Sequence, residues 1–246
     1  MKLILLRHGE SQWNLENRFT GWKDVSLTVQ GKKEANFSGN ELLKNNFRIT
    51  TIYTSLLKRA TETTDIVAQI INFPNEKIKY HWSLNERHYG ALQGLNKSET
   101  AAKYGEDQVH IWRRSYDIAP PLLDLNDKRH PRFNTKFQNI NSDLPVGESL
   151  KDVISRLQPF WKEYVDSMLS IKGDHLIVAH SNSLRAIVKI LDKLSSREIM
   201  SVNIPTGVPL VYTLDKRLNV LKKEYLIKEG ELKVKQEIIA NQGKAK

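Results

Sequence analysis

Residues 3–10 read LILLRHGE, so four apolar residues run directly into arginine, histidine and glycine. The apolar run predicts a short β-strand that is buried on both faces, as in a parallel sheet covered by helices. Arg7 and His8 stand where that strand ends, and open parallel sheets bind their ligands at the carboxyl ends of their strands. The stretch therefore predicts a parallel sheet with chemistry at one of its edges.

A second stretch repeats this pattern late in the chain. Residues 175–180 read HLIVAH, which predicts another buried strand, again ending on a histidine. A helix follows at once, because Leu184, Ile187 and Val188 share one helical face. Since the carboxyl ends of parallel strands meet at one edge of a sheet, we expect His8 and His180 to lie on the same rim.

The remaining pattern alternates between strands and helices. Further strands are expected near 49–53, 80–84 and 209–214, and further helices near 27–46, 57–71 and 149–169. This order predicts an α/β fold, in which a mostly parallel central sheet is flanked by helices on both faces. We expect one domain over residues 1–246, with an irregular insertion at the active site over 97–147 and a mobile C-terminal tail over 229–246.

Composition excludes several classes of protein. The 246 residues are 39% hydrophobic and 27% charged, as in a soluble globular protein, and no apolar run is long enough to span a bilayer. The absence of cysteine excludes disulfides, thiolate nucleophiles and cysteine-based zinc sites. A cytoplasmic location is the expectation. The net charge of +10 fits a solvated basic surface, a nucleic-acid partner or a positive cleft for phosphorylated substrates.

The residues at the rim suit phosphoryl chemistry. A neutral imidazole such as His8 is a competent nucleophile near neutral pH, and the guanidinium of Arg7 offers a planar fork of donors to phosphate oxygens. Taken alone, Arg7 and His8 would better fit an ordinary strand end, with Arg7 in a surface ion pair. Arg59 stands in the first turn of a predicted helix, where an anion is favoured, and Glu86 is a candidate general acid and base.

Eight stretches together resemble a known family. Residues 5–14, LLRHGESQWN, resemble the signature of the histidine phosphatase superfamily. Further stretches along nearly the whole chain resemble the cofactor-dependent phosphoglycerate mutase branch of that superfamily. They are NRFTGWKDVSLTVQGKKEA, YTSLLKRATETT, LNERHYGALQGLNKSE, WRRSYDIAPP, HLIVAHSNSLRAIVKIL, NIPTGVPLVYTLD and ANQGKAK.

The resemblance implies a phosphoglycerate mutase-like fold and an isomerase of glycolysis and gluconeogenesis that interconverts 3-phosphoglycerate and 2-phosphoglycerate. It implies a phosphohistidine at His8, primed by 2,3-bisphosphoglycerate, with Glu86 as proton donor and acceptor and with Arg7, Arg59 and His180 around the phosphoryl group. It also implies a set of substrate-binding residues: Ser11, Asn14, Thr20, Gly21, Arg87, Tyr89, Lys97, Arg113, Arg114, Ser181 and Asn182.

The same resemblance implies no metal, with small phosphorylated three-carbon acids as substrates and a homodimer or homotetramer as the assembly. Neither a nucleic acid nor a membrane is expected as a partner, because the sequence has no nucleic-acid-binding signature and no apolar run long enough for a bilayer. Alternatives are a histidine phosphatase or a bisphosphoglycerate mutase or phosphatase of the same superfamily and, more distantly, a basic nucleic-acid-binding protein. A mutase has to exclude water from its intermediate, and the insertion and the tail are long enough to form such a cover.

Two positions depart from the family pattern. Ser181 stands where the family usually has glycine, and its side chain would crowd the site if the backbone there had a positive φ. We therefore expect reduced or unchanged activity. Val146 and Gly147 replace the polar residues that usually precede Glu148, and the sequence offers no functional reason for this change.

Overall fold

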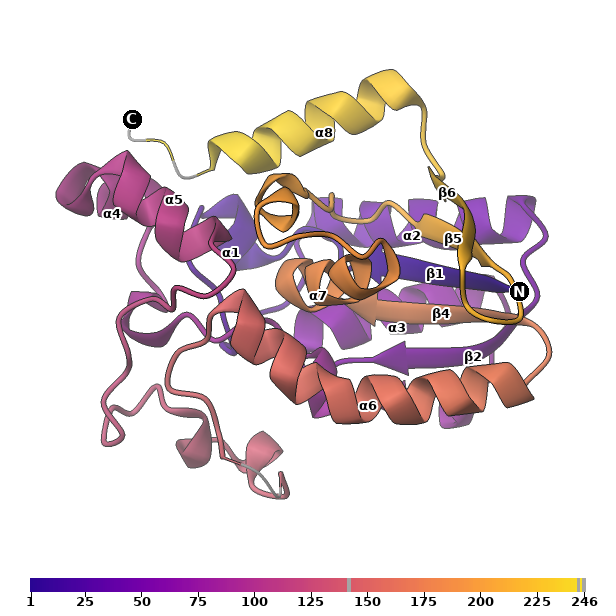
Figure 1. The fold of residues 1–246 in the computed structure, drawn as a ribbon, viewed down its shortest axis with the longest axis horizontal. Coiled ribbons are helices and arrows are strands. Elements are labelled where there is room, and N and C mark those ends of the chain that lie inside the picture. The colour runs from indigo at the N-terminus through magenta and orange to yellow at the C-terminus, as the bar shows by residue number, and fades with distance from the viewer. Residues whose placement is uncertain (141–142, 243, 245–246) are drawn as a thin grey trace.

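A six-stranded sheet forms the centre of the computed structural model, which describes residues 1–140, 143–242 and 244 (Figure 1). The order across the sheet is β3-β2-β4-β1-β5-β6. The pairs β1–β4, β2–β4 and β2–β3 are parallel, and β5 is antiparallel to both β1 and β6, so the expected mostly parallel sheet is confirmed. The strands are β1 (Lys2–Arg7), β2 (Ile49–Thr54), β3 (Lys79–Tyr80), β4 (Asp174–Ala179), β5 (Leu210–Leu214) and β6 (Val220–Tyr225).

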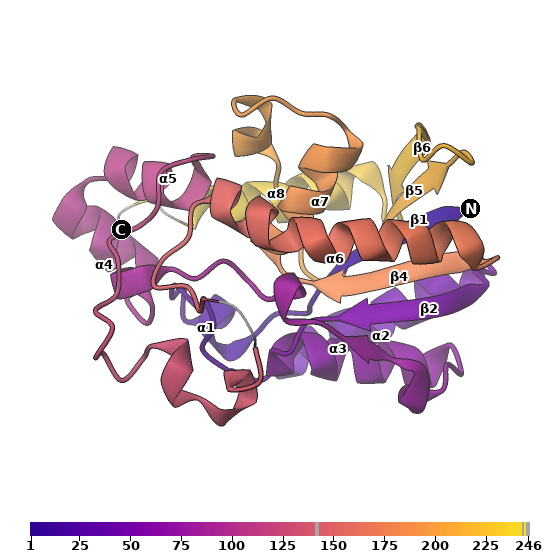
Figure 2. The same ribbon diagram turned by 60° about the horizontal axis from the view of Figure 1, so that its bottom comes forward.

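Helices cover both faces of the sheet, as Figure 2 shows. On one face, Ile4 and Leu6 of β1 belong to the apolar core that includes residues of α2 (Val29–Lys44) and α3 (Lys58–Ile70). On the other face, Leu3 and Leu5 pack in the core formed with α6 (Leu150–Ser170) and α7 (Ser181–Leu191). Alternate residues of a strand point to opposite faces, so a strand buried on both sides needs the continuous apolar run seen at 3–6.

Part of the irregular segment expected over 97–147 is helical. Helix α4 (Lys97–Tyr104) begins at Asn96, whose side chain accepts from the backbone N–H groups of Ser98 and Glu99. Helix α5 (Glu106–Arg114) follows directly after Gly105, which has a φ of +89°. The prediction of irregular structure is therefore wrong for residues 97–104 and 106–114. From 115 onward, short 3₁₀ turns at Pro131–Phe133 and Thr135–Phe137 interrupt an otherwise irregular chain, and residues 141–142 lie outside the described part.

Two strand predictions also need correction. The strand expected over 80–84 is only the two-residue β3, because the chain turns into a 3₁₀ helix at Trp82–Leu84. That turn is capped by the His81 side chain, which accepts from the Ser83 N–H. The edge strand β6 was not expected, since three of the six residues of its sequence VLKKEY are charged. It pairs with β5 through antiparallel backbone hydrogen bonds, and Val220 and Tyr225 at its two ends pack against the apolar core.

The C-terminal tail expected to be mobile over 229–246 includes a regular helix, α8 (Glu229–Asn241), and its mobility stays a prediction. It runs from β6 toward α4 and α5 in Figure 1. Lys235 pairs with the carboxylate of Glu34 at 3.0 Å, and the Arg113 guanidinium donates to the Ile239 carbonyl at 3.2 Å. Residues 243, 245 and 246 of the tail lie outside the described part. Within that part, no helix has the length and hydropathy to cross a bilayer.

Candidate active site

The two rim histidines lie side by side. Strands β1 and β4 pair in parallel with Arg7 opposite Ala179, and the His8 N–H donates to the Ala179 carbonyl at 3.0 Å. Each strand ends at this point, so the next residues, His8 and His180, leave the sheet together. Their ring centroids are 4.9 Å apart, with the rings tilted by 58°. The parallel pairing therefore produces the juxtaposition that the sequence predicted.

His8 is held as a neutral imidazole with one lone pair available. Its Nδ1 lies 2.7 Å from the Gly9 carbonyl, which can only accept, so Nδ1 carries the proton. The lone pair of Nε2 then accepts from Nε of Arg59 at 3.2 Å. Burial, followed by the charges of Arg59 and Arg7, holds the pKa of His8 well below its ordinary value. The ring therefore stays neutral and nucleophilic at neutral pH.

Gly9 permits the close packing behind the nucleophile. A Cβ built on Gly9 would lie 2.2 Å from the Gly31 carbonyl oxygen at the start of α2, which no side chain can tolerate. The Gly9 N–H donates to Oγ1 of Thr63 on α3 at 3.1 Å. Both helices on this face of the sheet therefore fix the loop that presents His8.

Backbone carbonyls orient two buried arginines beside His8. Arg59 donates to the carbonyls of Gly21 at 2.9 Å and Lys23 at 3.0 Å, and burial lowers its pKa to about 10. Arg7 donates to the Ile204 carbonyl at 2.8 Å, and burial likewise lowers its pKa. The Nε of Arg7 is buried and has no hydrogen-bond partner among the described residues. Both guanidinium groups are thus placed to receive an anion.

One carboxylate oxygen of Glu86 accepts three hydrogen bonds. Its Oε1 accepts from the Arg87 N–H at 2.7 Å, from the Asn182 N–H at 3.1 Å and from Nδ2 of Asn182 at 2.9 Å. Asn182 stands in the first turn of α7, where backbone N–H groups favour a negative charge. Three donors on one oxygen leave Oε2 as the position for exchanging a proton with a ligand.

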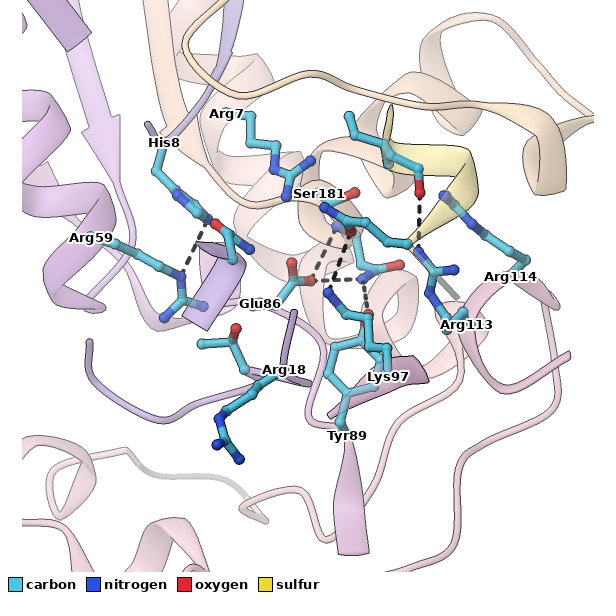
Figure 3. A pocket seen from close by; sticks show the side chains of 15 residues that line it. Arg7, His8, Arg18, Arg59, Glu86, Tyr89, Lys97, Arg113, Arg114 and Ser181 are labelled. Carbon is cyan, nitrogen blue, oxygen red and sulfur yellow. Dashed lines mark hydrogen bonds between the residues drawn. The ribbon is translucent and has the colours of Figure 1, made fainter. Parts of the chain in front are cut away.

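His180 and Ser181 form the start of α7. Oγ of Ser55 lies 2.6 Å from Nε2 of His180 and thereby orients its ring. Ser181 is the first helical residue, and it is not among the residues with positive φ. The strain considered for a side chain at this position is therefore absent, and Ser181 lines the cavity from a helical backbone (Figure 3).

Basic side chains from distant segments converge on one cavity, shown in Figure 3. Beyond His8, Lys97, Arg113 and Arg114 form a second cationic group. Burial and the neighbouring arginines hold the pKa of Lys97 well below its ordinary value, and the pKa of Arg114 is lowered in the same way. Glu86 is the one carboxylate among the described residues that line the cavity. The cavity is therefore built for a ligand with several negative charges.

Most of the substrate-binding residues implied by the resemblance line this cavity. They are Asn14, Thr20, Tyr89, Lys97, Arg113, Arg114, Ser181 and Asn182. Three others lie behind the cavity wall. Ser11 caps the short helix α1 (Gln12–Leu15), the carbonyl of Gly21 holds Arg59, and Arg87 lies 4.6 Å from the ring centroid of Tyr89 and donates to the Trp112 and Arg113 carbonyls.

Three lining residues were not anticipated, namely Arg18, Ile239 and Gln242. Arg18 belongs to a stretch that carried the resemblance, but nothing in its spacing marked it out. Gln242 follows α8, and its Oε1 accepts from Nζ of Lys97 at 3.4 Å. Its place depends on how the tail packs, which local sequence does not reveal. Among the described residues, no group of three histidine, aspartate or glutamate side chains is arranged to hold a metal ion.

A family model and a full-length relative both match this chain. A model of the histidine phosphatase superfamily (branch 1) matches residues 3–223. The chain is 51% identical to the 2,3-bisphosphoglycerate-dependent phosphoglycerate mutase of Treponema denticola over 247 residues, which cover 100% of both chains.

Solved structures of this fold are also similar. A mycobacterial glucosyl-3-phosphoglycerate phosphatase complexed with VO3 has a TM-score of 0.70 at 21% identity, covering 92% of this chain and 98% of that one. The alpha-ribazole phosphatase of Shigella flexneri has a TM-score of 0.64 at 20% identity, covering 90% and 95%. At such identities the likeness concerns the fold alone. The matched family model and the 51% identity to a full-length relative establish that the chain belongs to the histidine phosphatase superfamily, as its motifs predicted.

Proposed function

We propose that this chain is a 2,3-bisphosphoglycerate-dependent phosphoglycerate mutase that interconverts 3-phosphoglycerate and 2-phosphoglycerate in glycolysis and gluconeogenesis. The observation that carries the proposal is the second cationic group, Lys97, Arg113 and Arg114, in the cavity that also contains His8 and Glu86. A substrate with a phosphate at His8 and a further anionic group suits that arrangement. The 51% identity to a mutase over the full length supports the same reaction.

The cavity fits a bisphosphorylated primer. The unpartnered Nε of Arg7 and the clustered cations supply donors that a polyanion would satisfy. When bound, 2,3-bisphosphoglycerate supplies the phosphoryl group that primes the enzyme. Arg7, Arg59, His180 and Asn14 would hold the phosphate beside His8, and Thr20, Tyr89, Lys97, Arg113, Arg114, Ser181 and Asn182 would hold the remaining phosphate and carboxylate.

Each catalytic residue has a role that follows from its contacts. Nε2 of His8 accepts the phosphoryl group, because Nδ1 is committed to the Gly9 carbonyl. Arg59 and Arg7 stabilise the charge that spreads over the phosphoryl oxygens in the transition state. Oε2 of Glu86 donates a proton to the departing hydroxyl oxygen and removes one from the attacking hydroxyl. Ser11, Gly21 and Arg87 support these groups from behind.

Residues 1–246 act as one catalytic domain in this proposal, because the cavity lining extends from Arg7 to Gln242. The contacts of Ile239 and Gln242 with Arg113 and Lys97 support a covering role for the tail. Water excluded by this cover cannot hydrolyse the phosphohistidine while the ligand reorients. A phosphatase of the same superfamily would transfer the same phosphoryl group to water.

The test is an assay of product identity. Purified protein is mixed with 3-phosphoglycerate and a metal chelator, with and without a catalytic amount of 2,3-bisphosphoglycerate. We expect 2-phosphoglycerate to form in the presence of the chelator and to depend on the bisphosphate. Free phosphate as the main product would instead establish a phosphatase.

A second assay identifies the nucleophile. Labelled 2,3-bisphosphoglycerate should leave an acid-labile, alkali-stable phosphoryl group on the wild-type protein. His8→Ala should abolish this label. A label that persists in the variant would place the nucleophile elsewhere.

A further inference from the structure

Glu86 lies on a loop between two 3₁₀ turns, Trp82–Leu84 and Gly90–Leu92, so no regular element fixes its backbone. Side chains fix it instead. The Glu86 carbonyl oxygen accepts from Nε1 of Trp22 at 2.6 Å and from a guanidinium nitrogen of Arg156 at 3.0 Å. Both lone pairs of that oxygen are then used, so the peptide plane next to Glu86 has one orientation.

Arg156 holds more of the same loop. From helix α6 it donates to the carbonyls of Ser83 at 2.6 Å and Asn85 at 2.9 Å, in addition to that of Glu86. Oγ of Ser83 donates back to the Arg156 carbonyl at 2.9 Å. The Arg156 side chain is only 9% exposed. One rigid guanidinium therefore fixes the chain on the N-terminal side of the proposed acid and base.

Glu148 completes the arrangement on the other side of Glu86. Its Oε1 accepts from Nε of Arg156 at 2.5 Å, and its Oε2 accepts from a terminal guanidinium nitrogen of the same residue at 3.3 Å. Its Oε2 also accepts from the His88 N–H at 2.7 Å, and the Glu148 N–H donates to the His88 carbonyl at 2.9 Å. The buried ion pair thus forms hydrogen bonds with the loop on both sides of Glu86.

We propose that Arg156 and Glu148 are positioning residues for Glu86: they hold its loop so that the carboxylate meets the substrate oxygen, and they touch no substrate. Neither residue lines the cavity. The inference rests on the proposed acid–base role of Glu86. Displacement of a catalytic group by about 1 Å is enough to lower a rate on the order of 10²-fold. Lysine cannot replace Arg156, because it lacks the fork that reaches the carboxylate and the carbonyls together.

The test is a double-mutant cycle on the rate at which 2,3-bisphosphoglycerate phosphorylates His8 in a single turnover. The variants are Arg156→Lys, Glu86→Gln and the double variant, and the affinity for 2,3-bisphosphoglycerate is measured for each. We expect Arg156→Lys alone to lower the rate between about 10-fold and about 100-fold, with affinity nearly unchanged. In the Glu86→Gln background it should lower the rate by no more than about twofold.

Arg129→Lys is the matched control, because Arg129 also pairs with a carboxylate, that of Asp127, and donates to two carbonyls, those of Ala91 and Gln93. It should leave the rate unchanged. If Arg156→Lys does not fold, Glu148→Gln takes its place in the same cycle. Effects that multiply in the double variant, or a full rate in Arg156→Lys, would overturn the inference. A full rate in Glu86→Gln would overturn both this inference and the assigned role of Glu86, and no labelling of the wild type would overturn the proposed function as well.

Discussion

Lowering the pH from 7.5 to 5.5 should strongly destabilise the ligand-free protein, because several of its histidines are buried in neutral form. His8, His88 and His180 are at most 2% exposed. Burial is the first cause that lowers the pKa of each, to about 3 for His88 and well below the ordinary value for the other two. In the unfolded chain these side chains titrate near their ordinary pKa of about 6.5.

The sign and size of the effect follow from proton linkage. Between pH 7.5 and 5.5 the unfolded chain takes up protons that the folded protein does not bind, so the free energy of unfolding falls as the pH falls. A single histidine with an unfolded pKa of about 6.5 contributes a loss of about 1.4 kcal/mol over this interval. Three such residues give about 4 kcal/mol, against a total stability of about 5–15 kcal/mol for a typical protein.

Urea unfolding at the two pH values, followed by tryptophan fluorescence, measures this loss. His88→Gln provides an internal check, because His88 does not line the cavity and its removal should reduce the pH-dependent loss by about 1.4 kcal/mol. Equal stabilities at pH 7.5 and 5.5 would refute the reasoning. So would a His88→Gln variant that keeps the entire pH dependence.

Three more outcomes follow from the cavity. Free 2,3-bisphosphoglycerate at 100 times its Kd should raise the free energy of unfolding by about 2.7 kcal/mol, seen as a higher Tm; an unchanged Tm would contradict binding. Lys97→Met should raise the stability of the free protein by about 1 kcal/mol in urea unfolding, because it removes a cation buried beside Arg113, and should weaken bisphosphate binding; a destabilised variant would count against this. Removing the tail after Gly230 should raise hydrolysis relative to transfer, and an unchanged product ratio would show that α8 is no cover.

The fold was predictable where apolar periodicity reports burial. Residues 3–6 and 175–179 are buried strands, and the pairing of β1 with β4 explains why two distant histidines meet. Helix α4 escaped prediction for a physical reason. Its buried residues include Lys97, Ser98 and Thr100, polar side chains that an apolar pattern cannot detect. Apolar periodicity therefore does not predict a helix whose buried side chains include a cation that faces a cavity.

The site was predictable where one motif carries several residues, as in the stretches around His8 and Glu86. Contacts between distant segments outside the parallel strands were not. The place of Gln242 depends on the packing of α8, for which the 3.0 Å pair between Lys235 and Glu34 is one determinant. The buried ion pair of Arg156 and Glu148 connects helix α6 to the Glu86 loop. Arg156 and Glu86 are 70 residues apart in the sequence, so no local spacing indicates this contact.

The way in which the arginines are held explains how one cavity remains strongly positive. Arg7, Arg59 and Arg113 are buried, and apart from the bond from Nε of Arg59 to His8 their hydrogen bonds go to backbone carbonyls. Within the described part of the chain, none of the three forms an ion pair with a carboxylate. A carbonyl satisfies an N–H donor without cancelling its charge, so the charge stays available for a polyanion. Arg156, which does not line the cavity, is instead neutralised by Glu148 at 2.5 Å. Carbonyl partners therefore leave the charges of Arg7, Arg59 and Arg113 available to a ligand, whereas the carboxylate of Glu148 neutralises the arginine that supports the loop behind the cavity.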